Sequence, residues 1–143
     1  MKKLLAAVLA ASVSFSVFGY DIFSYVSING NAKSYTCTEY SVATKFGDYF
    51  RTPVGKVVHV LDGGGKDIES AEYTPRDVLI NKIKYVYDSK GNITTKTGYN
   101  SSDEVIWRTA SSFKNGEKHD ESQFGKDNSL KAKTIYCYSE GLL

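Results

Sequence analysis

Apolar and polar side chains alternate along much of the second half of the chain, most clearly between Ile93 and Tyr138. Successive side chains of a strand point to opposite faces, so this period of two predicts β-strands. No stretch of the chain after residue 19 keeps apolar residues at helical spacing, and we therefore expect little helix. The segments expected to be turns, because they are rich in Gly, Asn, Asp and Ser, are 62–66, 88–92, 100–103 and 114–116.

The same pattern returns after about 26 residues. At that offset Tyr73 falls on Tyr99 and Asp77 falls on Asp103, and a third copy fits, with Phe124 on Tyr99, once one residue is dropped from its turn. A fixed period of this size is typical of repeat architectures. We expect an all-β protein, an antiparallel meander of hairpin repeats over 61–143 with an irregular N-terminal β cap over 20–60, together forming one domain.

The parity of each strand sorts its side chains into two faces. One face is apolar and is expected to be covered, with Trp107 buried at its centre. The other face is mixed, as in an antiparallel sheet with one wetter side. The apolar face collects Leu79, Ile83, Tyr85, Tyr87, Val105, Trp107, Phe113, Leu130, Tyr136 and Tyr138.

The cap is less regular than the repeats. Residues 20–28 and 34–42 read as the strands of an opening hairpin around an Asn-Gly turn signal at 29–31. Residues 43–53 hold aromatic side chains without a clean period, and we expect a loop with a short strand or helical turn. A β-branched strand is expected over 56–61.

Residues 1–19 have the pattern of a secretory signal peptide: a basic start, a short apolar run and small residues before a plausible cut. We therefore expect an exported protein, periplasmic or secreted, with no integral membrane segment, because the apolar run is shorter than the roughly 20 residues that a span needs. Without Lys2 and Lys3 the remaining 18 − 2 = 16 basic residues balance 16 acidic ones. This balance argues against nucleic acid as a partner.

The two cysteines, Cys37 and Cys137, stand near the two ends of the predicted domain. In an oxidising compartment an isolated pair favours a disulfide, which would close nearly the whole domain. The alternative is that both are buried thiols on strands that never meet.

Three basic residues, Lys82, Arg108 and Lys133, occupy equivalent positions in the three units. In a regular meander they would form a basic row with tyrosines nearby, able to bind an acidic polymer or a glycan. The alternative is that the row is neutralised by nearby acids, the candidates being Glu69, Glu72, Glu104 and Glu121.

Signals for catalysis or metal binding are weak. The triple glycine at 63–65 lacks the pattern of a phosphate-binding loop and is explained by a turn. His59 alternates with valines and is expected to be hydrogen-bonded or half-exposed in a strand. His119 and Glu121 share a face, but two ligands are too few for a specific metal site. We therefore assign no catalytic residue, no metal and no cofactor.

The segment Tyr87-Asp88-Ser89-Lys90-Gly91-Asn92 resembles the tyrosine-aspartate repeats of bacterial surface proteins and Rhs-type shells, and the chain is similar to hairpin arrays of small secreted bacterial proteins. The resemblance covers 61–141, and only the middle unit carries the full motif. It implies a meandering β-sheet and attaches no catalytic residue to the repeats.

The abundance of tyrosine suits recognition, because its side chain combines contact area with a polar tip. The first hypothesis is a non-catalytic binding module of the envelope or secreted fraction that contacts a protein or glycan. The alternatives are a small secreted inhibitor of a hydrolase, which a protruding segment at 43–53 would favour, and an enzyme without a recognisable motif. The last strand, 130–138, is expected either to be covered by an N-terminal strand or to self-associate through its edge.

Overall fold

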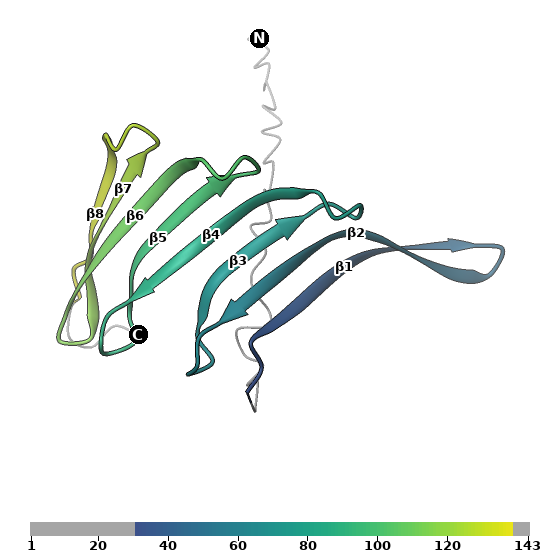
Figure 1. Ribbon diagram of the computed structural model, residues 1–143, viewed down its shortest axis with the longest axis horizontal. Helices are drawn as coiled ribbons and strands as arrows, with labels where there is room; N and C mark the ends of the chain where they lie inside the picture. The colour runs from purple at the N-terminus through teal and green to yellow at the C-terminus, as the bar shows by residue number, and fades with distance from the viewer. Residues whose placement is uncertain (1–30, 139–143) are drawn as a thin grey trace, which may run out of the picture.

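The computed structural model describes residues 31–138, which form eight antiparallel strands in one sheet, each strand lying beside the next in chain order (Figure 1). The expected all-β meander is confirmed. Within this part of the chain no helix is long and apolar enough to cross a membrane. The strands are β1 (Ser34–Lys45), β2 (Asp48–Leu61), β3 (Asp67–Tyr73), β4 (Leu79–Tyr87), β5 (Ile93–Asn100), β6 (Val105–Lys114), β7 (Glu117–Gly125) and β8 (Leu130–Ile135).

The predicted turns are present, and aspartate side chains organise two of them. After β2 the Asp62 carboxylate accepts hydrogen bonds from the backbone N–H groups of Gly64 and Lys66, at 2.8 and 2.9 Å. After β4 the Asp88 carboxylate accepts from the backbone N–H groups of Lys90 and Asn92, both at 2.9 Å. Such local bonds are the reason that aspartate favours turns.

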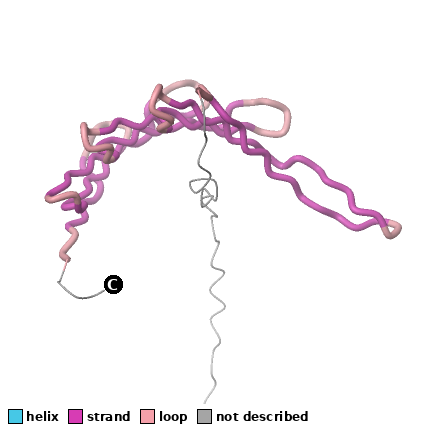
Figure 2. Tube along the Cα trace, turned by 90° about the horizontal axis from the view of Figure 1, so that it is seen from below, coloured by secondary structure: helices cyan, strands magenta, loops and turns pink. Residues whose placement is uncertain are grey.

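The sheet is curved into an arch one layer thick (Figure 2). Each of the seven strand pairs contains one shift of register, for example between Val60 and Leu61 on β2 and between Gly98 and Tyr99 on β5. An extra residue on one strand bends that strand and increases its twist. One such irregularity in every pair is a sufficient local cause of the arch.

The sorting of side chains into two faces agrees with the register, since Ile83, Gly98 and Trp107 stand opposite one another on β4, β5 and β6. The expectation that this face is covered is wrong for the described residues, which form a single layer. Buried side chains are accordingly few. Among residues 31–138 the buried side chains are those of His59, Leu61, Ser70 and Ala71.

Trp107 is half-buried, which corrects its expected position in a covered core. Its indole lies over Gly98 on the neighbouring strand, where the missing side chain leaves room for it. The ring is therefore sheltered by its own sheet and not by a second layer.

Residues 43–53 are not a loop. β1 continues to Lys45, a two-residue turn of Phe46 and Gly47 follows, and β2 begins at Asp48. Both turn residues have positive φ, 55° and 86°, as a tight hairpin turn requires. The predicted signal peptide at 1–19 and the strand predicted at 20–28 lie outside the described residues.

The predicted Cys37–Cys137 disulfide is wrong: the structure contains no disulfide between them, and the strand order explains why. Cys37 belongs to β1 and Cys137 follows β8, so the two residues stand at opposite edges of an eight-stranded sheet. The same order excludes β1 as a cover for β8. Within residues 31–138, β8 pairs only with β7.

Candidate functional site

The most exposed apolar side chains lie on a two-stranded extension of β1 and β2. β3 pairs with β2 only as far as Lys56. The ends of β1 and β2 next to the 46–47 turn, residues 39–45 and 48–55, therefore pair only with each other. We call residues 39–54 the arm. It projects beyond the rest of the sheet (Figure 1), and every residue in it is exposed.

The arm is rich in large apolar side chains. Phe46, at the tip, is 91% exposed and Tyr49 is 78% exposed. The other large apolar side chains exposed on the arm are Tyr40, Val42, Phe50 and Val54. Single exposed apolar residues are ordinary, but a contiguous group of them marks an interaction site.

The three basic residues singled out from the sequence lie on one face of β4, β6 and β8, but they do not form a straight row. The register places Arg108 level with Lys84, through Thr97 on β5, so Arg108 and Lys82 are offset along the strands. Followed across β7, β6 and β5, the register places Lys133 level with Val86, still further along β4. The three cations therefore follow a diagonal across the sheet.

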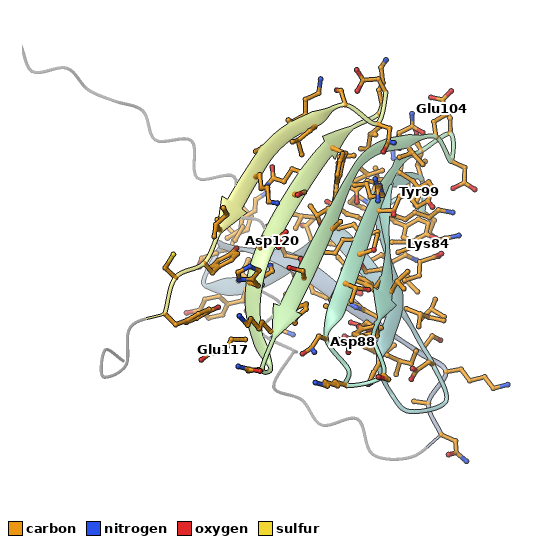
Figure 3. The ribbon with its side chains drawn as sticks, turned by 90° about the vertical axis from the view of Figure 1, so that its left-hand side faces the viewer. Lys84, Asp88, Tyr99, Glu104, Glu117 and Asp120 are labelled. Atoms are coloured by element: carbon orange, nitrogen blue, oxygen red, sulfur yellow. The ribbon has the colours of Figure 1, made fainter. Side chains whose placement is uncertain are left out.

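Each of these cations is engaged with a neighbour. Lys82 Nζ lies 2.5 Å from Asp103 Oδ1 and 5.4 Å from the centre of the Tyr99 ring. Figure 3 shows Tyr99 close to Lys84, whose Nζ also lies 5.4 Å from that ring centre. The hydrogen bond between Lys82 and Asp103 raises the pKa of the lysine and lowers the pKa of the aspartate.

Arg108 and Lys133 make corresponding contacts of their own. The Arg108 guanidinium lies 4.4 Å from the centre of the Phe124 ring and donates a hydrogen bond to Asn128 Oδ1 at 2.9 Å. Lys133 Nζ lies 3.9 Å from Asp120 Oδ1, and half of the lysine side chain is exposed. The partners of the row are thus turn and strand residues other than the four glutamates considered from the sequence.

The contact seen at Lys82 recurs 26 residues earlier in the chain. Lys56 Nζ lies 2.6 Å from Asp77 Oδ1 and 5.6 Å from the Tyr73 ring centre. Lys56, Tyr73 and Asp77 each stand 26 positions before their counterparts Lys82, Tyr99 and Asp103. The contacts of Lys56, Lys82 and Arg108 thus brace aromatic rings and turns of the sheet. The side chain of Lys133 is half exposed.

A polar cluster on the opposite face joins β1, β2 and β3. His59 is 6% exposed, and its Nδ1 lies 2.9 Å from Asp67 Oδ2. The Tyr35 ring stacks on the His59 ring, with centroids 4.3 Å apart and planes 4° apart, and its hydroxyl donates to the same Asp67 oxygen at 3.5 Å. The prediction of a hydrogen-bonded strand histidine is confirmed.

The cluster extends to β4 through two tyrosines. Ser70 stands opposite His59 on β3, and its hydroxyl forms a hydrogen bond of 2.9 Å with the Tyr85 hydroxyl. The Tyr87 hydroxyl donates to the Asp67 carbonyl at 2.7 Å, and burial raises the pKa of Tyr87. A serine, a histidine and an aspartate are thus neighbours, but the Ser70 hydroxyl is buried and held by Tyr85. The arrangement suits cross-strand bonding better than nucleophilic catalysis, which needs a reachable hydroxyl activated by the base.

A small hollow lies beside the turn between β6 and β7. Its volume is about 170 Å³, below the roughly 300 Å³ at which ligand pockets begin. Among residues 31–138 no group of three or more potential metal ligands lies together. The hollow is lined by Lys114, Asn115, Glu117, Lys118, His119 and Tyr138.

The chain was compared with family models, curated proteins and solved structures, and none of them matches it.

These sites are only partly predictable from the sequence. The aromatic side chains of residues 43–53 indicate a segment that would matter if it protruded, but their pattern does not predict a hairpin. The partners of His59 were missed, because finding Asp67 and Ser70 requires the register of β2 on β3, which shifts at Val60 and Leu61. The alternating pattern places Tyr35 in a strand, but it does not predict which strand lies beside it.

Proposed function

We propose that the protein is an exported, non-catalytic binding module of the bacterial envelope or secreted fraction, and that the arm is its binding element. The observation that carries this proposal is the concentration of exposed aromatic and aliphatic side chains on one projecting hairpin. Tyrosine and other large side chains that become enclosed at an interface contribute most of its binding energy. A protein or glycan of the envelope or of a host is the proposed class of partner.

The sheet is the rigid support of this binding element. Its lysines and aromatic rings contact one another across the strands, and its turns are held by aspartate side chains. Export through a signal peptide at 1–19 belongs to the same proposal.

A second candidate function is the inhibition of a hydrolase. The arm is the observation that favours it, because a narrow projecting hairpin fits the open cleft in which a hydrolase binds its substrate. Inhibition is a special case of binding through the arm. It is distinguished by loss of the partner's activity when the protein is added.

The test compares two forms of the protein without residues 1–19, each immobilised and exposed to envelope and secreted fractions. One form is the wild-type sequence. In the other, residues 41–52 are replaced by Asn-Gly, so that Tyr40 and Pro53, which already face each other across β1 and β2, flank a two-residue turn. Circular dichroism confirms that the shortened form keeps its strands.

We expect one or more proteins or glycans to be retained by the wild-type form and lost from the shortened form. A Ser89→Ala form, altered in an exposed turn of the sheet, serves as the matched control and is expected to bind like wild type. Equal retention by the shortened form would move the binding site to the sheet. Retention of nothing by the wild-type form from either fraction would refute the proposal of a binding module.

A further inference from the structure

Apolar side chains occupy both broad faces of the arm as well as its tip. Directly paired residues of two antiparallel strands point to the same face. Val42 pairs with Arg51, and Thr44 pairs with Tyr49, so Val42 and Tyr49 lie on one face. Ala43 pairs with Phe50, and this pair lies on the other. A flat surface would touch only one of these faces.

The tip carries a residue that the turn itself does not favour. Phe46 has φ 55°, and a bulky side chain in this left-handed region is unusual and strained. The turn between β6 and β7 has the same form, with Asn115 at φ 55° followed by Gly116 at φ 88°, close to the 86° of Gly47. Asparagine is the ordinary choice at this position. One sheet thus contains the same turn with a favoured residue and with a strained, 91% exposed phenylalanine.

Backbone strain of this kind persists only where the surrounding structure holds it, and it clusters at functional sites such as ligand clamps. Here the ring makes one described contact, with Lys45 Nζ 5.2 Å from its centre. A cation above an exposed ring does not account for a strained backbone, because such contacts contribute only about 0.5–1 kcal/mol. The contacts described within residues 31–138 therefore do not account for a phenylalanine at this position.

The charges of the arm favour a protein over a membrane surface as the partner. The arm contains two acidic residues, Glu39 and Asp48, and two basic residues, Lys45 and Arg51. A balanced charge gives no attraction to anionic lipid, whose binding to protein depends on clustered basic residues. Side chains on two faces and at the tip also need walls around them, which a folded protein supplies.

We propose that the arm enters an apolar cleft of a folded partner protein, tip first, with the Phe46 ring at the bottom of the cleft. The proposal rests on the proposed binding function and adds the shape and chemistry of the partner's site. The part that enters, from Glu39 to the turn, is roughly 24 Å long at about 3.4 Å per residue. The walls of the cleft contact Val42 and Tyr49 on one side and Phe50 on the other.

The first experiment maps the contact with a photoreactive benzophenone amino acid. It replaces Phe46, Val42, Phe50 or, as a control, Ser89 in separate preparations of the otherwise intact protein, which are then irradiated with envelope and secreted fractions. The expected result is one adduct of the same mass from positions 46, 42 and 50 and none from position 89. An adduct from only one of positions 42 and 50 would mean a flat contact, which would overturn the cleft while leaving the binding function intact.

The second experiment separates the ring from the stability of the turn. Phe46→Asn removes the ring and restores the favoured turn residue, so it preserves or strengthens the hairpin. Unlabelled wild-type or Phe46→Asn protein is added as a competitor, and the loss of the adduct formed from position 42 is measured. An interface residue that dominates binding contributes enough that we expect Phe46→Asn to need at least about 30-fold more protein than wild type for the same inhibition. Competition equal to that of wild type would overturn the proposal.

Two further measurements test the alternative partners of the arm, a membrane and a second copy of the chain. Vesicles of phosphatidylethanolamine and phosphatidylglycerol are sedimented with the protein, and the protein alone is examined by sedimentation velocity. Neither vesicle binding nor self-association that is lost in Phe46→Asn is expected. Either result would replace the partner's cleft with a membrane or a second copy of the chain. Adducts absent from all four positions, together with an empty immobilised column, would refute the binding function itself.

Discussion

Close contacts of individual residues replace the missing second layer in this sheet. Gly98 allows the Trp107 indole to lie against the neighbouring strand, and Tyr35 covers the His59 ring. These contacts bury little area each, because within residues 31–138 nothing covers either face of the sheet. They work in place of a core by pairing a ring with a gap, a cation or another ring on the adjacent strand.

Gly98→Ala is expected to reduce the free energy of unfolding by about 1–3 kcal/mol, the ordinary cost of forcing an extra methyl group into a packed site. The added methyl would overlap the Trp107 indole and push it off the sheet. Urea unfolding followed by tryptophan fluorescence measures the change. Gly63→Ala is the matched control, because no atom lies within 4 Å of the methyl it would add. An equal, small effect at both glycines would mean that the indole does not rest on Gly98.

At the scale of strands and turns, the sequence was sufficient where a local rule decides the structure. Alternation and turn residues identified β5, β6 and the Asp62 and Asp88 turns, because side chains close to each turn complete its hydrogen bonds. The same reasoning failed at residues 43–53. Phe46-Gly47 lacks the asparagine that marks a tight hairpin turn, although its backbone is the same as that of Asn115-Gly116.

The turn carboxylates make the stability of the sheet sensitive to acid. Hydrogen bonds lower the pKa of Asp62 and Asp88 below their ordinary value of 3.8, chiefly from the Lys66 backbone N–H at Asp62 and from the Asn92 side chain at Asp88. A lowered folded-state pKa adds stability above the unfolded-state value, and this stability is lost as the pH falls through the folded-state pKa. The free energy of unfolding is therefore expected to fall below about pH 4.

Asp88→Asn tests the origin of this acid sensitivity. At neutral pH the variant is expected to be less stable than wild type, because the neutral amide is a weaker acceptor than the carboxylate. The difference between the two proteins should shrink as the pH falls below the ordinary aspartate pKa of 3.8 and Asp88 begins to be protonated. Urea unfolding midpoints at several pH values measure it. A difference that stays constant over this range would show that the charge of Asp88 is irrelevant.

At the scale of the whole molecule, the strand order determines whether Cys37 and Cys137 can meet, which composition and compartment alone do not. The meander was predicted, but the closing disulfide was not compatible with it, since a sheet in chain order separates Cys37 from Cys137 by its full width. The arch depends on a register shift in every strand pair, and the cross-strand partners of His59 depend on the same shifts. Residue periodicity does not encode such shifts, so neither the curvature nor the polar cluster was predictable.

Cys137→Ser gives a test of the open architecture. Because no bond joins Cys137 to Cys37, the substitution is expected to change the free energy of unfolding by no more than about 0.5 kcal/mol, as at other surface positions. A disulfide closing a loop of this size would contribute up to about 4.7 kcal/mol in the chain-entropy model. Unfolding with and without reductant distinguishes the two cases. A loss of several kcal/mol, reproduced by reductant in the wild-type protein, would contradict the open sheet.

Amide hydrogen exchange of the intact protein, alone and with the retained envelope or secreted fraction, is the most direct test of binding through the arm. The free arm should exchange quickly, because a two-stranded ribbon without further strands is only marginally stable. On binding, exchange at residues 39–54 should slow, while exchange in β5 and β6 should stay as it was. Slowed exchange across β5 and β6 with an unchanged arm would contradict the account.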